Sequence, residues 1–270
     1  MANIARLLLY VGVLFAIGDV FARWARGDTW AARVPADAQR GPVLAWLAIM
    51  TAAVVLFIVQ FFALELAPTV TDVGLLVRET TWGRGWMLLA ACSLAGMFVT
   101  IVRAPLLARA AVALFLAAAM GGLGHAAADE AYPLLSRGLD ALHVLGIGAW
   151  LGTLACLALV PSASASLESW TRLSAVAIVA APLTVLTGLG SALRRVSSAS
   201  PSEVIVSDYG RLLAGKIAIV ALILWLGNRH RRQLRARDLP TLSSVRLELV
   251  LACVALAVTA VLTGTSPPGD

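Results

Sequence analysis

Long apolar runs alternate with short polar stretches along most of the chain. A helix needs roughly 20 mostly apolar residues to cross about 30 Å of hydrocarbon, because each residue rises about 1.5 Å. Eight runs approach or meet that length, and little of the chain remains for a soluble domain. The pattern therefore predicts an all-α polytopic membrane protein in which residues 1–270 form a single transmembrane domain, a bundle of eight helices. The predicted helices lie near 3–22, 43–65, 86–103, 105–124, 138–160, 171–193, 211–228 and 247–265.

Two local features refine these boundaries. Arg103, Ala104 and Pro105 separate the third run from the fourth, and proline does not continue a helix. We therefore expect a tight helical hairpin there and not one long helix. The first run has no strongly basic segment before it and no Ala-x-Ala cleavage site after it, so we expect a retained helix and not a removed signal peptide.

The composition agrees with a membrane protein and excludes a soluble globular enzyme. Hydrophobic residues make up 60% of the chain and charged residues 13%, whereas soluble domains contain about 45–50% and about 25%. The net charge of +6 comes from 20 arginines and one lysine placed between apolar runs, a distribution that indicates membrane topology and no nucleic-acid partner. The three cysteines lie far apart inside apolar stretches, so no disulfide framework and no Cys-x-x-Cys metal site is expected.

The distribution of arginine predicts the orientation. Short loops rich in lysine and arginine stay in the cytoplasm. The connection before the last helix carries five arginines between residues 229 and 237, and the predicted loops on that side hold 13 basic residues against eight on the other side. We therefore expect both termini outside, in the periplasm, and the protein in the cytoplasmic (inner) membrane of a bacterium, surrounded by lipid.

A cluster of ionisable residues marks the outer ends of the fourth and fifth predicted helices. Such residues cost several kcal/mol inside a bilayer unless they are paired or hydrated, so each is a candidate for function. His125 ends the fourth helix, and Asp140 and His143 open the fifth on one helix face, where a carboxylate fixes the tautomer of a ligating imidazole. Met120, deeper in the membrane, adds a thioether. Imidazole with a soft sulfur ligand suits copper, so these four residues are the predicted metal site.

Structural interpretations stand beside the functional ones. Histidine and aspartate at a helix end also serve as interfacial anchors that meet headgroups and water. Lys216 can snorkel outward or pair with Glu65 or Asp140, and Glu248 can anchor the last helix, relay protons or receive a departing metal ion. Glu65, Lys216 and Glu248 are therefore the candidate pathway or proton-relay residues. His230 lies in an arginine-rich connection, where we expect it to be solvated.

An ordered series of motifs resembles the copper resistance D (CopD) family of bacterial inner-membrane proteins. The resemblance covers residues 120–268 in detail and the first four helices only by general pattern. Two positions depart from the family pattern, because Thr153 replaces a glycine and Leu173 replaces a phenylalanine. The motifs, in chain order, are Gly-His125-Ala, Asp140-Ala-Leu-His143, Trp150-Leu-Gly152, Thr171-Arg172-Leu173-Ser174, Thr187-Gly188, Asp208-Tyr209-Gly210-Arg211 with Lys216, Asn228-Arg229, Ser244-Val245-Arg246-Leu247-Glu248 and Pro267-Pro268.

The resemblance implies copper handling in the cytoplasmic membrane. The family is described as taking up copper from the periplasm beside a small periplasmic copper-binding protein, CopC, and its candidate metal residues fall on His125 and His143. Both Cu(I) and Cu(II) remain open as the ion. We expect no enzymatic activity, and no ATP use because the chain has no glycine-rich phosphate loop.

Two other functions remain open. A b-type haem membrane oxidoreductase would use the same two histidines as iron ligands, although His125 lies at a helix end and only one such pair exists. A non-transporting copper-docking subunit would hold the metal at these histidines without passing it across the membrane.

Overall fold

The computed structural model describes residues 1–26, 40–66, 69–123, 132–159, 166–196, 199–266 and 268, and within these ranges every regular element is helical. His125 lies outside the described residues. The elements are α1 (Ala2–Arg26), α3 (Arg40–Ala63), α4 (Val70–Glu79), α5 (Thr81–Ile101), α6 (Leu106–Gly121), α7 (Pro133–Ile147), a π-helical turn η3 (Gly148–Gly152), α8 (Thr153–Leu159), α9 (Leu167–Arg195), α10 (Pro201–Val206), α11 (Asp208–Arg235) and α12 (Leu242–Leu262).

In the part of the chain that the structure describes, seven helices are long and apolar enough to cross a membrane. The predicted span 105–124 corresponds to α6, which is apolar but only 16 residues long, below the usual range of about 17–25. The all-helical class is therefore confirmed, whereas the count of eight spans and the outward position of the termini stay predictions. The seven candidate spans are α1, α3, α5, the continuous helix Pro133–Ala158, α9, α11 and α12.

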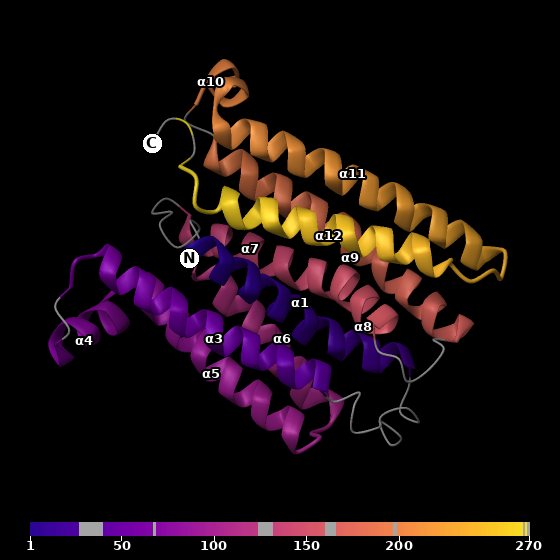
Figure 1. The fold of residues 1–270 in the computed structure, drawn as a ribbon, viewed down its shortest axis with the longest axis horizontal. Coiled ribbons are helices and arrows are strands. Elements are labelled where there is room, and N and C mark those ends of the chain that lie inside the picture. Colours follow the sequence, from indigo (N-terminus) through magenta and orange to yellow (C-terminus); the bar gives the residue numbers. More distant parts are fainter. Residues whose placement is uncertain are drawn as a thin grey trace.

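Helix α1 lies at the centre of the bundle and packs against helices on both sides of it (Figure 1). On one side it joins α3, α5 and α6 in a core that includes the fully buried Ile17, Ile49 and Leu89. On the other side it joins η3, α8, α9, α11 and α12 in a second core, which includes Trp150 and Ile223. One helix thus contributes to both cores, which explains why α1 is the most buried of the candidate spans after Pro133–Ala158.

The closest helix contact joins α1 to the π-helical turn. A Cβ atom on Gly18 would lie 2.2 Å from the backbone carbonyl carbon of Gly152, a distance that no side chain can occupy. Two glycines therefore allow the backbones to meet directly, as small residues do where membrane helices approach closely. This contact holds the π-helical turn in place, and Trp150 of the turn lines a cavity together with residues of α9 and α11.

The hairpin between α5 and α6 forms as predicted. Arg103 adopts a left-handed conformation (φ 54°), and the Ala104 backbone N–H donates to the Val99 carbonyl at 2.9 Å, which closes the end of α5. Pro105 then serves as the N-cap of α6 with extended backbone angles. The proline thus ends one helix and starts the next.

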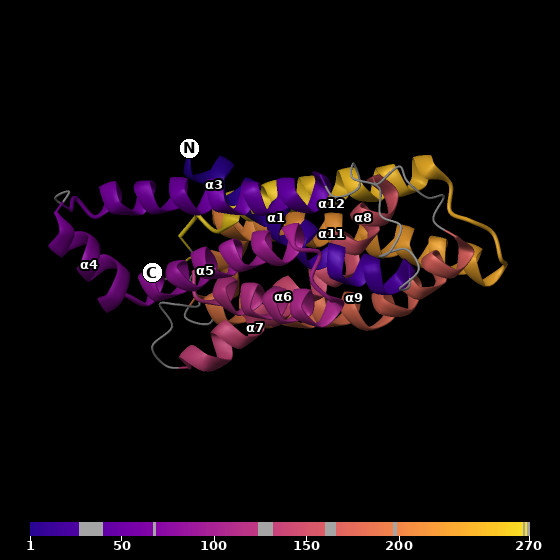
Figure 2. The ribbon, with the colours of Figure 1, turned by 90° about the horizontal axis from the view of Figure 1, so that it is seen from below.

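Both described termini lie at the same end of the bundle, together with α4 and α10, and the arginine-rich end of α11 lies at the opposite end (Figure 1). Figure 2 shows α4 projecting beyond the bundle between α3 and α5. We call the two ends the terminal end and the arginine-rich end. The prediction from the arginine distribution, that the arginine-rich side faces the cytoplasm, thus applies to this second end.

Helix α10 is a short polar-capped element at the terminal end. The Ser200 backbone N–H and hydroxyl donate to the Glu203 carboxylate at 2.7 and 2.8 Å, and the Glu203 backbone N–H donates back to the Ser200 hydroxyl. This capping box holds the pKa of the exposed Glu203 carboxyl below its ordinary value, first through the backbone bond and then through the hydroxyl bond. None of the eight predicted helices covers α10.

Candidate functional site

His143 is held in a defined orientation between α7 and α9. Its Nδ1 lies 2.8 Å from the Thr184 carbonyl oxygen and 3.3 Å from the Thr187 hydroxyl oxygen. The Thr187 hydroxyl donates its own proton to the Leu183 carbonyl at 2.6 Å, so toward His143 both oxygens are acceptors. Nδ1 therefore carries the imidazole proton, and Nε2 keeps its lone pair. This is the tautomer that binds a metal ion through Nε2.

A glycine on α9 makes room for the imidazole. A Cβ atom on Gly188 would lie 2.8 Å from Cε1 of His143 and 3.1 Å from its Nδ1. Any side chain at position 188 would therefore push the ring away from Thr184. Thr187-Gly188 is one of the motifs of the sequence, and both residues contact the imidazole. The Thr187 hydroxyl oxygen accepts from the ring, and Gly188 leaves space for it.

Asp140, one turn before His143, is bound by α9 and not by the imidazole. The Ser191 hydroxyl donates to the Asp140 carboxylate at 2.7 Å, and Arg195 forms an ion pair with it at 3.3 Å. The expected carboxylate–imidazole bond is therefore replaced by the Thr184 carbonyl. We call Asp140, His143, Thr184, Thr187, Ser191, Arg195 and Lys216 the α7–α9 polar cluster.

Lys216 of α11 completes this cluster. It lies close enough to His143, Asp140 and Arg195 to interact with all three electrostatically, so of the two carboxylates suggested for it the structure brings Asp140 near. With Arg195 and Lys216 beside a single carboxylate, the cluster holds more basic than acidic groups. A cation bound at Nε2 of His143 therefore needs further ligands from outside these residues.

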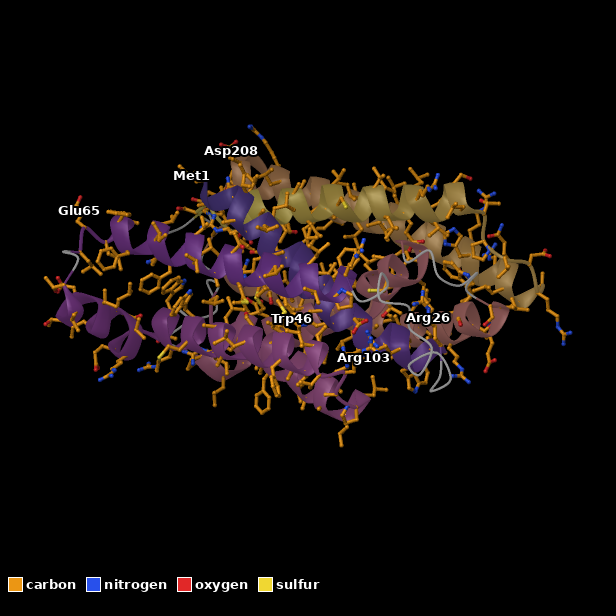
Figure 3. All side chains as sticks on the ribbon, turned by 60° about the horizontal axis from the view of Figure 1, so that its bottom comes forward. Met1, Arg26, Trp46, Glu65, Arg103 and Asp208 are labelled. Atoms are coloured by element: carbon orange, nitrogen blue, oxygen red, sulfur yellow. The ribbon has the colours of Figure 1, made fainter. Side chains whose placement is uncertain are left out.

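The other predicted site residues lie elsewhere. Met120 is buried in the first core, on the face of α6 that packs against α1 and its neighbours, whereas His143 points toward α9. Glu65 is exposed in a left-handed turn (φ 52°) after α3, and Figure 3 shows it at the tip of the molecule, on the side of Met1 and Asp208 and away from Arg26 and Arg103. Among the described residues, no three His, Cys, Asp or Glu side chains gather as a metal site.

Glu248 and His230 form a buried pair toward the arginine-rich end. Their side chains face each other with 2.9 Å between the Glu248 Oε2 and the His230 Nδ1, and the His230 Nε2 lies 2.7 Å from the Ser244 hydroxyl. His230 is 6% exposed and Glu248 is 1% exposed. The prediction that His230 is solvated is wrong, because α11 continues through Arg235 and turns this residue inward. The spacing of Ile223, Leu226 and His230, all buried, carried that signal.

A second buried network ties α1 to α6 near the same end. Asp19 accepts from Arg23 at 2.7 Å and lies 3.4 Å from Arg109, and Arg109 also donates to the Ala104 carbonyl at 3.0 Å. Arg109 therefore joins α6 to Asp19 of α1. The two lie 90 residues apart, so no local spacing links them.

These features define the class of the protein. Long apolar helices enclose buried ion pairs and oriented polar side chains, which is the arrangement of a multi-pass membrane protein. The α7–α9 polar cluster and the His230–Glu248 pair lie toward opposite ends of the bundle. His143 itself lies ten residues inside the helix Pro133–Ala158, deeper than the predicted position at the outer end, because this helix begins at Pro133 and not near 138.

The comparisons with known proteins support one family. Residues 167–262, which span α9 to α12, match the sequence model of the family described as CopD, Copper resistance protein D. A protein named Copper resistance protein D from Pseudomonas syringae pv. tomato is 32% identical over 186 residues, which are 63% of this chain and 59% of that relative. The chain thus spans about three fifths of the relative's length. No solved structure matches the chain. Both matches agree with the resemblance to the CopD family that the motifs indicate, and they support a copper-related membrane protein.

Proposed function

We propose that the protein receives copper at the terminal end of the bundle, in the periplasm, and passes it toward the cytoplasm. The single observation that carries this proposal is the orientation of His143. Its Nδ1 proton is committed to the Thr184 carbonyl, which leaves Nε2 as a nitrogen donor of the kind that copper prefers. The family match supports copper as the cargo.

In this proposal His143 supplies one ligand and His125 the second. His125 follows α6 in the sequence, and α6 packs against α7, so the segment that carries it starts next to the helix of His143. Asp129 and Glu130 lie in the same connection and would supply the negative charge that the α7–α9 polar cluster lacks. Asp140 acts by holding Arg195, and Met120 would offer a thioether from the core side of α6.

The inward path ends at Glu248. This carboxylate and Lys216 lie in the bundle at opposite ends, so we assign them to the exit and to the entrance. The buried hydroxyls of Thr184 and Thr187 beside His143, and that of Thr153, would offer further oxygen ligands along the path. Glu65 keeps no role in the path because its position is exposed and remote.

A small periplasmic copper-binding protein of the CopC type is the proposed donor. It would dock at the terminal end, where α4 and α10 lie outside the bundle. In this scheme the protein lies in the cytoplasmic membrane of a bacterium. Copper is its cargo, and the protein performs no chemical conversion.

Copper uptake by proteoliposomes tests the proposal. Purified protein is reconstituted, copper is added outside, and internal copper is measured over time for wild type, His143→Ala and Glu248→Gln. We expect uptake in wild type, loss of both binding and uptake in His143→Ala, and loss of uptake with retained binding in Glu248→Gln.

Two results would redirect the assignment. Histidine-dependent copper binding with no uptake by wild type would identify a copper-docking subunit. Copper uptake that is unchanged in His143→Ala would overturn the site.

A further inference from the structure

A cavity of about 220 Å³ lies between α9 and α11, near the arginine-rich end and apart from the α7–α9 polar cluster. Its wall is mostly apolar and includes Trp150 of the π-helical turn and Trp170 and Pro182 of α9. Ile178, which is 46% exposed, lies on the same wall. Because this residue is in the middle of a candidate span, the cavity opens sideways, toward the hydrocarbon of the bilayer.

The length of the cavity matches one leaflet of a membrane. Its lining runs from Trp170 to Pro182 along α9, about 18 Å at 1.5 Å per residue, and from Leu224 to Leu234 along α11, about 15 Å. The hydrocarbon core of a bilayer is about 30 Å thick, so one leaflet takes up about 15 Å. The wall as a whole, including Arg231, therefore has about the depth of one leaflet, and its apolar part has room for a segment of an acyl chain.

The polar groups of the cavity gather toward its arginine-rich end. Arg231 lies on the wall, half-buried, and within the described residues its guanidinium makes neither a hydrogen bond nor an ion pair. His230 and Glu248 also line the cavity, but they face each other at 2.9 Å and together add no net charge when ionised. The cavity is thus left with one unpartnered positive charge at the level where a headgroup would lie.

The surroundings strengthen this positive charge. Arg232 and Arg235 follow Arg231 on the same helix, in its last turn. Basic pockets between membrane helices at the cytoplasmic side bind the headgroups of anionic lipids. The cavity's volume of about 220 Å³ is below the about 300–1,000 Å³ of pockets that enclose a whole small ligand, so a lipid would place only part of itself inside.

We propose that this cavity is a binding site for an anionic phospholipid of the leaflet at the arginine-rich end. One acyl chain fills the groove between α9 and α11, and the phosphodiester accepts hydrogen bonds from the Arg231 guanidinium. The bound lipid completes the packing between these two helices, which the protein alone leaves open. The site does not depend on copper.

Lipid-dependent thermal stability tests the proposal. Delipidated protein in a neutral detergent is titrated with phosphatidylglycerol, with phosphatidylcholine of the same acyl chains, and with inorganic phosphate, and the unfolding temperature is followed. We expect a saturable rise with phosphatidylglycerol only. Arg231→Gln should weaken the apparent affinity on the order of tenfold, the equivalent of one charged hydrogen bond.

Two further variants separate the headgroup from the chain. Arg229→Gln removes an equal charge from the same helix at an exposed position outside the cavity wall and should keep the wild-type response. Ala177→Phe fills the groove and should abolish the response while the headgroup contact at Arg231 remains intact.

Several outcomes would overturn the site. An equal rise with phosphatidylcholine would show that no charge recognition occurs, and an equal rise with inorganic phosphate would show that the acyl chain contributes nothing. Equal responses of Arg231→Gln and Arg229→Gln would reduce the effect to general charge attraction. If either cavity variant fails to fold, native mass spectrometry of the wild type decides: retention of phosphatidylglycerol and not phosphatidylcholine supports the site, and equal retention refutes it.

Discussion

Replacing Gly188 by alanine gives a sharp test of the His143 geometry, because Gly190 on the same helix provides a matched control. A Cβ atom at position 188 would lie 2.8 Å from the imidazole Cε1. A Cβ atom at position 190 would lie 3.5 Å from Leu139 Cδ1, which is an ordinary van der Waals contact. Both substitutions sit inside α9 and gain the same helix propensity, about 1 kcal/mol.

The difference between the two variants therefore isolates the displacement of the imidazole. When the ring moves, the buried Nδ1 donor loses the Thr184 carbonyl, and an unsatisfied buried donor costs about 1–3 kcal/mol. We expect Gly190→Ala to be neutral or stabilising by up to about 1 kcal/mol. Gly188→Ala should have a free energy of unfolding lower than that of Gly190→Ala by about 1–3 kcal/mol.

Two assays check this expectation on the same samples. Denaturant unfolding in detergent gives the free-energy difference, and copper titration gives the affinity of the site. Gly188→Ala should weaken copper binding because it misplaces Nε2, whereas Gly190→Ala should leave it unchanged. Equal unfolding free energies and equal copper affinities in the two variants would refute the described contact between α7 and α9.

Three further predictions follow from other parts of the molecule. Asp19→Asn should destabilise the protein by about 3–5 kcal/mol in denaturant unfolding, because it removes the carboxylate that pairs with the buried Arg109. The exposed Glu168→Gln should cost less than about 1 kcal/mol, and equal losses would contradict the buried network. The capping box lowers the pKa of the Glu203 carboxyl, so it stabilises α10 fully above the ordinary carboxylate pKa, and this stabilisation is lost as the pH falls through the lower pKa of the folded protein. An NMR titration of this carboxyl that shows no downward shift of its pKa would contradict the capping box. A membrane-impermeant maleimide should label Ser202→Cys but not Arg232→Cys in intact spheroplasts, and the reverse pattern would invert the proposed orientation.

The long apolar runs made the helical class predictable. The predicted positions of α1, α3, α5, α9 and α12 agree with the structure to within five residues at each end, because about 20 apolar residues in a row leave few alternatives. Helix α11 continues seven residues beyond its predicted end, through the arginine-rich segment. The hairpin at Pro105 was equally clear, because proline stops a helix for a local reason. The short α4 and α10 were not predicted, because ten and six residues are too few to form an apolar run of membrane-spanning length.

The site was harder to predict because its partners lie on different helices. The sequence marked Asp140 and His143 as one face, but it did not show that Ser191 and Thr184 of α9 hold them. Thr184, Ser191 and Arg195 recur at helical spacing along one face of α9, and this spacing is the feature of the sequence that indicates a polar face toward α7. In the case of His230, the neighbouring arginines suggested a loop, whereas helical continuity buried the side chain against Glu248.

The copper content of the purified protein, measured together with an optical spectrum of the same sample, tests directly whether His125 and His143 hold copper. Wild type, His143→Ala and the His125→Ala, His143→Ala double variant are purified in detergent, with an Arg229→Gln variant as a control that touches neither histidine. We expect about one bound copper ion per wild-type chain, no Soret band, and loss of the copper in the double variant while its helical content is unchanged. Equal copper in wild type and the double variant would contradict the copper site, and a Soret band that disappears with the histidines would assign them to haem.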